Sequence, residues 1–416
     1  MYYTKGEEMR RYIILSTVTT VSIFAAAYKL PEQSIAGTAL GAANVASCSG
    51  ADCAYYNSAN SIFLEPNKQF IEAGLTYVHL PKIEYKGSQI LNGNPITATA
   101  KSKSEDVAIP YFHYISKAYG DYRFALSMTV PGGLTKRWDS PVQKLFAQKF
   151  ELKTIMANPS IAYRANKNLA ISAGISAVYS KGKVNNDGNS LGLPIKREMS
   201  GDSIDYGYNL SASLQLDNGL NLAATYRSKI KLSEEGDATL YLGNLAQKYN
   251  AKVNIYLPAT LTLAVSKDIY RTSLEFVYER TFWSSYKSLD FKYDKPIHPV
   301  LKDAFGTPKV KNWRDTNTFR VGLKYKYSNN LTVMAGYSYD QTPIREKYIS
   351  YELPDSNAHI FSTGFIYKQN QNLSWGASIL YDNKKERTIK NNINGINGKF
   401  SKGGAILVTA GFRYKF

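Results

Sequence analysis

The chain has 416 residues, enough for two or three ordinary soluble domains or for one large all-β unit. Tyrosine occurs 33 times and cysteine twice, and the mean hydropathy of -0.32 excludes a bundle of membrane helices, each of which needs an apolar run of roughly 20 residues. The formal net charge of +18 would favour a nucleic-acid partner in a cytosolic protein.

A secretory signal sequence is predicted at the N-terminus, over residues 1–27. Met9 and two arginines precede an apolar stretch of about a dozen residues, and Ala25 and Ala27 supply small side chains at the -3 and -1 positions. We expect cleavage before Tyr28, with Met9 as the true initiator. The alternative is a single anchoring helix, although the stretch is short for a membrane span.

Export changes the meaning of the positive charge. It argues against nucleic acid and points to outer-membrane lipids, lipopolysaccharide phosphates or anionic ligands as partners of a basic surface. The alternative is a proteome-wide lysine bias without functional meaning. We expect a monomer in the outer membrane of a Gram-negative bacterium, crossing it many times.

The segment after the predicted cleavage site differs from the rest of the chain. Residues 28–68 are rich in glycine and alanine and alternate poorly, so we predict that they fill a lumen as a plug rather than form wall strands. A disordered periplasmic tail is the alternative, and the aromatic and apolar content argues against it. Cys48 and Cys53 are close enough for a short disulfide in an oxidising compartment. Two thiols without nearby histidines are too few for a metal site, and we predict neither metal nor cofactor.

From residue 69 to residue 416 the chain repeats the period-two pattern of a membrane barrel, in which side chains alternate between lipid and lumen. The clearest example, residues 405–416, places these residues on one face: Ile406, Val408, Ala410, Phe412, Tyr414 and Phe416. Similar segments occur at 206–216, 274–278, 319–327, 331–339 and 373–381. Aromatics gather at strand ends, as interfacial girdles require. We predict an all-β fold, a transmembrane antiparallel barrel of about fourteen strands.

Connection lengths support this count. Tight turns are predicted at 118–121, 166–168, 217–219, 267–270, 328–330 and 369–372. Long polar loops are predicted near 80–106, 131–152, 180–204, 229–251, 282–313, 341–357 and 382–404. The alternation matches the short periplasmic turns and long extracellular loops of outer-membrane barrels.

The last strand must pair with the first, near residues 69–79, because an open edge in lipid leaves backbone groups unsatisfied. The terminal Phe416 resembles the C-terminal aromatic by which the outer-membrane assembly machinery recognises its substrates. We therefore expect that machinery to be a partner.

Short motifs occur in a fixed order along this pattern. They lie at residues 32–41, 52–59, 130–133 (Val-Pro-Gly-Gly), 158–163 (Asn-Pro-Ser-Ile-Ala-Tyr), 226–229 (Tyr-Arg-Ser-Lys), 257–260 (Leu-Pro-Ala-Thr) and 335–343. With them the sequence resembles the long-chain fatty acid transporters of the outer membrane, including the toluene-uptake porins, over nearly the whole mature chain.

The resemblance implies a fourteen-stranded barrel closed by an N-terminal hatch, with passive uptake of hydrophobic molecules and sideways release near the third strand, here residues 122–130. It identifies Asn57, Ser58 and Ala59 as the hatch box. Ser58 stands where the family has proline, which would fix φ and withhold an N–H group. We therefore expect a different hydrogen-bonding pattern at this position.

A fatty acid needs an apolar groove for its tail, since each buried methylene contributes roughly 0.8 kcal/mol. Apolar residues of the second, third and fourth outer loops are the candidates: Trp138, Leu145, Phe146, Leu191, Leu193, Leu240, Leu242 and Leu245. The resemblance places a low-affinity groove between the third and fourth loops. The alternative is that these residues only cap the barrel.

A carboxylate needs a cation, and arginine can bind it with two parallel hydrogen bonds. The candidates of inward parity are Arg227, Arg320, Lys324 and Arg413. The alternative is that each of them pairs with a lumen acid, such as Glu275, Glu279 or Asp340, or with the plug.

Three other functions compete with transport of fatty acids. A general or aromatic-hydrocarbon diffusion porin would share the barrel, but an open aqueous channel conflicts with a plug. A lipid hydrolase needs a nucleophile beside a base, and the one strand-borne base, His113, lies between Tyr111 and Tyr114, which favours packing. An adhesin role rests only on the long loops. We predict that the protein is not an enzyme.

Overall fold

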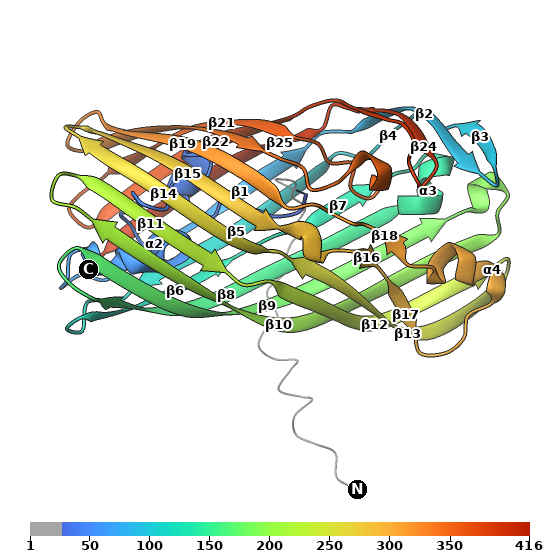
Figure 1. The fold of residues 1–416 in the computed structure, drawn as a ribbon, viewed down its shortest axis with the longest axis horizontal. Helices are drawn as coiled ribbons and strands as arrows, with labels where there is room; N and C mark the ends of the chain where they lie inside the picture. The colour runs from blue at the N-terminus through green and yellow to red at the C-terminus, as the bar shows by residue number, and fades with distance from the viewer. Residues whose placement is uncertain (1–26) are drawn as a thin grey trace, which may run out of the picture.

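The computed structural model describes residues 27–416 and shows a closed barrel of fourteen antiparallel wall strands (Figure 1). At three wall positions a short interruption divides the strand into two. The wall consists of β1 (Phe70–Leu80), β5 (Glu105–Ile115), β6 (Tyr122–Thr129) with β7 (Leu134–Arg137), β8 (Lys149–Arg164), β9 (Leu169–Asp187), β10 (Ile195–Gln215), β11 (Leu220–Arg227) with β12 (Ile230–Leu242), β13 (Leu245–Leu257) with β14 (Ala259–Ile269), β15 (Thr272–Phe282), β19 (Thr316–Lys326), β20 (Leu331–Asp340), β21 (Ala358–Lys368), β22 (Leu373–Lys384) and β25 (Gly404–Lys415). The predicted fold class is confirmed.

The barrel closes where the sequence predicts. β25 pairs antiparallel with β1, from Phe70 opposite Lys415 to His79 opposite Ile406. The predicted alternation is present on β25, where Ile406 and Phe412 are exposed on the outer face and Thr409 is buried. A band of exposed aromatic and aliphatic side chains therefore faces the bilayer. Among the described residues, no helix is both long enough and apolar enough to cross a membrane.

Two of the predicted long loops are wrong. Residues 180–204 and 229–251 belong mostly to β9, β10, β12 and β13, which continue the wall beyond the membrane (Figure 1). Outside lipid the outer face of a strand no longer needs apolar residues, and exposed Lys181 and Lys183 occupy it on β9. The apolar alternation therefore stops while the backbone pairing goes on.

The remaining outer connections form a lid of short elements over this end of the barrel. They are β2 (Glu84–Leu91), β3 (Asn94–Thr97), β4 (Ala100–Lys101), α3 (Pro141–Ala147), η2 (Asn189–Leu191), η3 (Trp283–Ser285), β16 (Ser288–Leu289), β17 (Phe291–Tyr293), α4 (Pro299–Leu301), η4 (Lys302–Gly306), β18 (Lys309–Val310), η5 (Glu346–Tyr348), β23 (Arg387–Ile389) and β24 (Ile396–Ser401). Their apolar side chains join those of the upper wall in one large buried cluster.

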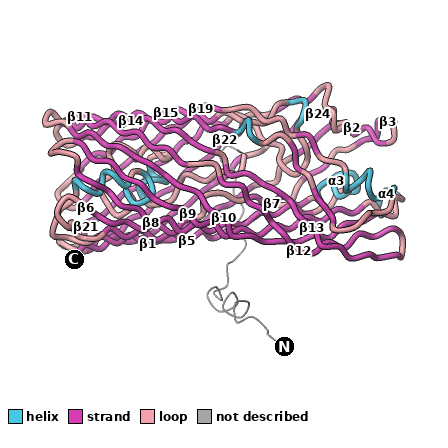
Figure 2. The backbone as a smooth tube through the Cα atoms, turned by 60° about the horizontal axis from the view of Figure 1, so that its bottom comes forward, coloured by secondary structure: helices cyan, strands magenta, loops and turns pink. Residues whose placement is uncertain are grey.

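The N-terminal segment, residues 27–68, lies inside the barrel as the predicted plug. It contains α1 (Ile35–Ala39), α2 (Cys53–Tyr56) and the 3-10 helix η1 (Ser58–Phe63), which Figure 2 shows within the wall near the end where the C-terminus lies. A disulfide joins Cys48 and Cys53, whose Cα atoms are 5.5 Å apart. The predicted signal sequence, residues 1–27, lies outside the described residues except for Ala27.

Glycines on the inner wall let the plug approach the backbone of the strands. A Cβ atom on Gly336 of β20 would lie 2.2 Å from the carbonyl carbon of Leu40, and one on Gly322 of β19 would lie 2.8 Å from the Cβ atom of Ala43. Any larger residue at Gly336 would therefore displace the plug. α1 packs against β20, β21, β22 and β25 in this way.

Candidate functional site

Charged wall residues fix the plug in place. Arg413 on β25 donates to Glu72 on β1 at 2.7 Å and to Asp52 in the plug at 3.0 Å. The Asp52 carboxylate also accepts bonds from Ser34 and Asn44 within the plug. Because the two carboxylates engage the guanidinium, Arg413 joins the closing strand pair to the plug.

Lys324 and Arg320, on β19, are also engaged. Lys324 donates to the side chain of Asn44 at 2.8 Å and to the carbonyl of Ser47 at 2.7 Å. Arg320 donates to Glu279 of β15 at 3.2 Å, and Lys29 of the plug pairs with the same carboxylate. These contacts favour the structural alternative for three of the four predicted cations.

Arg227, at the end of β11, is different. Its Nη2 atom donates to the carbonyl of Tyr55, and its guanidinium lies 4.4 Å from the centre of the Tyr55 ring. Its buried Nη1 atom has no hydrogen-bond partner among the described residues. A buried N–H group of a cation without a partner is costly unless a ligand satisfies it. Arg227 can therefore bind an anionic group by donating a hydrogen bond from Nη1.

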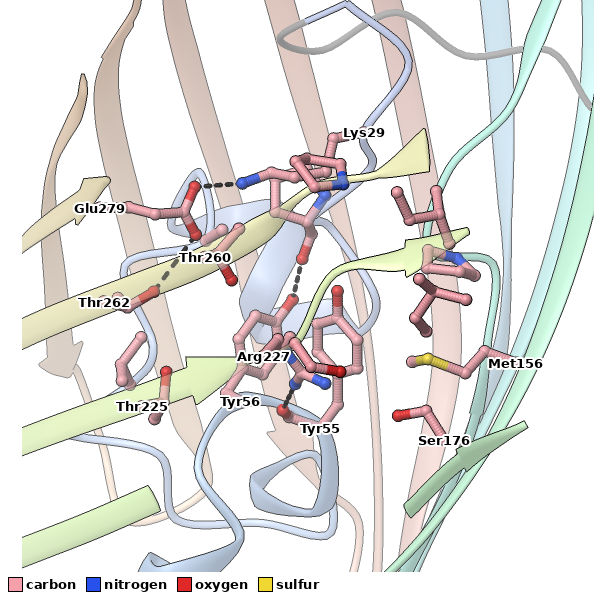
Figure 3. A pocket seen from close by; sticks show the side chains of 18 of the residues that line it. Lys29, Tyr55, Tyr56, Met156, Ser176, Thr225, Arg227, Thr260, Thr262 and Glu279 are labelled. Carbon is pink, nitrogen blue, oxygen red and sulfur yellow. Dashed lines mark hydrogen bonds and ion pairs between the residues drawn. The ribbon is translucent and has the colours of Figure 1, made fainter. Parts of the chain in front are cut away.

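Arg227 lines a cavity of about 90 Å³ between the plug and the wall. Figure 3 shows its labelled side chains: Tyr55 and Tyr56 from the plug, Met156 and Ser176 from β8 and β9, and Thr260 and Glu279 on the opposite wall. Most of the lining is apolar, with Arg227, Arg320, Lys29 and Glu279 as the charged groups. The cavity has room for several water-sized groups, hence for part of an acyl chain beside a carboxylate.

Near the cavity the backbone pairing of the wall is interrupted. β5 pairs with β1 along its whole length, but its pairing with β6 covers only Phe112 to Ile115. No ladder pairing joins residues 105–111 to β6 or β7 in the part of the chain that the structure describes. We call this the β5–β6 break. Pro131, which follows β6, also lines the cavity.

At the β5–β6 break the plug forms backbone hydrogen bonds with the segment that follows β6. Leu30 donates from its backbone N–H to the carbonyl of Pro131 at 3.0 Å, and Gly133 donates to the carbonyl of Tyr28 at 2.8 Å. Proline and glycine end regular pairing, so residues 131–133 can bend toward the lumen. The first residues of the plug are therefore part of the wall at the β5–β6 break.

The hatch box is held by wall hydroxyls. Ser58 and Ser172 share a hydrogen bond of 2.6 Å between their Oγ atoms, and the N–H group of Ala59 donates to Ser211 at 3.2 Å. The side chain of Asn57 donates to the carbonyl of Val45 at 3.2 Å. The serine that stands in place of proline thus adds a bond to β9 that proline could not make.

The predicted outer-loop residues divide into two groups. Trp138, Leu145 and Leu240 are buried in the core, and Trp138 donates from its indole N–H to the carbonyl of Tyr351 at 2.9 Å. The other five are less enclosed. Phe146, Leu191, Leu193 and Leu242 are partly buried against this core, and Leu245 is 75 % exposed at the tip of the β12–β13 hairpin.

Two plug anchors were not predicted from the sequence. The buried guanidinium of Arg123, on β6, donates to the carbonyls of Ser116, Ser61, Leu64, Glu65 and Lys68. The Gln33 amide donates to the carbonyl of Val130 at 2.7 Å and accepts from its N–H group at 3.1 Å. The inward parity of Arg123 on the third strand is a sequence signal that could have identified it; Gln33 had none.

His113, the base that a hydrolase would have needed, is buried. Its Nε2 atom lies 2.6 Å from the carbonyl oxygen of Gln33, and its ring stacks with Tyr111 at 5.6 Å. It serves the contact between wall and plug.

Known proteins share this architecture. The family model described as outer membrane protein transport protein (OMPP1/FadL/TodX) matches residues 16–416. The long-chain fatty acid transport protein of Escherichia coli O6:H1 is 25% identical over 358 residues, covering 76% of this chain and 78% of that protein. Outer membrane protein P1 of Haemophilus influenzae is 23% identical over 398 residues, 84% of each chain.

Solved structures agree on the fold. The crystal structure of a Pseudomonas aeruginosa FadL homologue has a TM-score of 0.82 at 20% identity and covers 94% of this chain and 99% of that one. The Pseudomonas putida toluene transporter TodX has a TM-score of 0.72 at 18% identity, covering 93% and 99%. These relatives are transport channels rather than enzymes. The chain therefore belongs to the outer membrane protein transport family (OMPP1/FadL/TodX) and is an outer-membrane transporter of hydrophobic molecules.

Proposed function

We propose that the protein carries long-chain fatty acids passively across the outer membrane, binding the carboxylate at Arg227 and releasing the ligand sideways through the wall. The observation that carries this proposal is the unpartnered Nη1 atom of Arg227 at the edge of an apolar cavity. A carboxylate there would satisfy a buried donor while the acyl chain fills apolar space.

Capture begins at the outer end. Phe146, Leu191, Leu193, Leu242 and Leu245 supply the accessible apolar surface over the lid, and the acyl chain of a fatty acid from the medium would bury against them. From there the ligand would pass inward to the cavity. The names of the relatives from Escherichia coli support the choice of substrate.

Sideways release is supported by the β5–β6 break and by the plug. The cavity reaches Pro131, and it is also lined by Lys29 and Pro31, the neighbours of the plug residues that bond to residues 131–133. A shift of Tyr28 and Leu30 would open a path into the bilayer. Below the cavity, the plug blocks the lumen through its contacts with Arg413, Lys324 and Arg123.

A rebuilt third strand tests lateral release. In the triple variant Pro131→Val, Gly132→Thr and Gly133→Val, the chain regains the N–H group that proline lacks and gains strand-forming side chains. A Cβ atom at residue 132 would lie 2.5 Å from the carbonyl oxygen of Tyr28, so the variant favours pairing with β5 over pairing with the plug. We expect slower uptake of radiolabelled oleate by cells that lack other transporters, at unchanged surface levels of the protein. Unchanged uptake would refute release through the β5–β6 break.

An aromatic hydrocarbon is the second candidate substrate, because the cavity is walled by Tyr55 and Tyr56 and the structurally similar TodX is a toluene transporter. A neutral hydrocarbon would gain nothing from Arg227. Replacing Arg227 by glutamine would then leave toluene uptake unchanged, whereas it would weaken the binding of a fatty acid.

A further inference from the structure

The wall contains a second break, between β10 and the divided strand β11–β12. β10 pairs with β9 without interruption from Leu169 to Asp187. On its other side it pairs with β11 only from Asn209 to Gln215 and with β12 only from Ile195 to Asp202. Residues 203–208 of β10 therefore lack ladder pairing to β12. We call this the β10–β12 break.

The break coincides with a change of register. Asn209 lies opposite Arg227, and Asp202 lies opposite Glu235, so the partner strand contains one residue more than β10 across the interval. Such an extra residue is a β-bulge, which bends the strand and disrupts the ladder locally. It also reverses the facing of the side chains, and both Arg227 and Ile230 line the cavity.

One backbone bond, from the N–H group of Ser228 to the carbonyl of Tyr208 at 2.9 Å, and two side-chain bonds hold the β10–β12 break together. The N–H group of Tyr208 donates to the Oγ atom of Ser228 at 2.8 Å, and that of Ser233 donates to the carboxylate of Asp205 at 3.0 Å. At Gly207 a Cβ atom would lie 2.6 Å from Cγ1 of Ile230. The Ile230 side chain thus packs directly on the bare backbone of Gly207 and covers the break from inside.

The cavity extends to this break. Its lining includes Tyr208, Ser228 and Ile230, and Tyr208 is 51% exposed on the outer face of the wall. Tyr208 also lines a hollow of about 500 Å³ on that face, whose wall is almost wholly apolar. Its apolar lining includes Phe124, Ile161, Ile175 and Leu210 beside Tyr208. One residue therefore borders both the inner cavity and a lipid-facing depression.

We propose that the β10–β12 break is a second lateral passage, through which the acyl chain of a bound fatty acid enters the bilayer at the outer hollow. This inference rests on the proposed function, because it assumes that the cavity holds an apolar ligand. Rotation of the Ile230 and Tyr208 side chains opens the passage, and the one backbone bond near it is that between Ser228 and Tyr208. The cavity thus lies between two breaks, with Pro131 at one end and Tyr208 at the other.

A cysteine pair closes the second passage. Gly207→Cys with Ile230→Cys places two thiols across the β10–β12 break, where the Cβ position at 207 is close enough to the side chain of 230 for a disulfide. The matched control is Ala212→Cys with Ala224→Cys, directly opposed residues of the paired part of β10 and β11. Both pairs are oxidised in wild type and in the triple variant at residues 131–133.

The readout is the rate of oleate uptake by cells, before and after reduction of the disulfide. We expect uptake to persist at a lower rate in the triple variant, to be lost when the 207–230 disulfide is added, and to return on reduction, with no effect of the 212–224 disulfide. The proposal is overturned if the 207–230 disulfide changes uptake in neither background, or if the triple variant alone abolishes it. Absence of oleate uptake by the unmutated protein would instead refute the proposed function.

If the 207–230 cysteine variant does not insert into the outer membrane, Ile230→Trp is used instead, because it fills the space over Gly207 without a disulfide. Its expected result is the same loss of the uptake that remains in the triple variant. The matched substitution Leu232→Trp, on the same strand and inward face beyond the cavity lining, controls for the added bulk.

Discussion

At the scale of single residues, the inward arginines of this barrel do two kinds of work. Arg413 and Arg123 use their donors on plug and wall groups, whereas Arg227 keeps one buried N–H group without a partner. Parity along a strand identifies all of them as inward, but it does not distinguish an anchor from a ligand-binding group. That distinction depends on which plug atoms face each arginine, and the plug folds by contacts far apart in the sequence.

Arg123 is expected to contribute most to retention of the plug. Arg123→Ala removes one hydrogen bond from each of its five carbonyl partners, and we expect the free energy of unfolding to fall by about 3 kcal/mol. Urea titration of the protein in detergent measures this free energy of unfolding. The control is Lys167→Ala in the turn before β9, whose ion pair with Asp217 is 79% exposed on the lysine side and should contribute less than about 1 kcal/mol. Equal losses would contradict the anchoring role.

At the scale of strands and loops, prediction succeeded where lipid constrains the sequence. β25 and β1 were located to within a residue because each lipid-facing position must be apolar. Outside the membrane that constraint ends, so the sequence pattern wrongly predicts loops for the outer halves of β9, β10, β12 and β13. The β10–β12 break could not be predicted either, although the Tyr-Arg-Ser-Lys motif lies at its bulge. A bulge reverses which side chains face the lumen, and it can be recognised only when the pairing with the neighbouring strand is known.

The C-terminal residue Phe416, which follows β25, leads to a prediction about membrane insertion. The backbone of Phe416 already pairs with Gln69, at 2.9 and 3.1 Å, and its exposed ring stacks on Tyr414 at 5.7 Å. If the assembly machinery reads this ring, deleting Phe416 should lower the amount of inserted protein without changing ligand affinity in the fraction that inserts. Phe412→Ala, on the same outer face, is the control. Normal surface levels of the truncated protein would contradict the expectation.

At the scale of the whole molecule, the proposed function requires a path for a hydrophobic ligand that avoids the plugged periplasmic end of the lumen. The plug is bound to every side of the lower barrel, through Glu275 and Lys324 on one side and Ser172 and Arg123 on the other. The described wall strands are weakly paired at the β5–β6 and β10–β12 breaks, both of which lie next to the cavity. Both breaks are therefore consistent with the proposed exit into the membrane.

The direct measurement is mass spectrometry of lipids that co-purify with the detergent-extracted protein, compared between wild type and Arg227→Gln. A hydrogen bond to a charged group contributes about 1.5–3 kcal/mol, so we expect roughly tenfold to hundredfold weaker binding in the variant. Arg271→Gln, at an exposed turn outside the cavity, is the control. We predict stoichiometric free fatty acid on wild type and on the control, and its loss from Arg227→Gln. Absence of fatty acid from wild type, or equal recovery from Arg227→Gln, would contradict it.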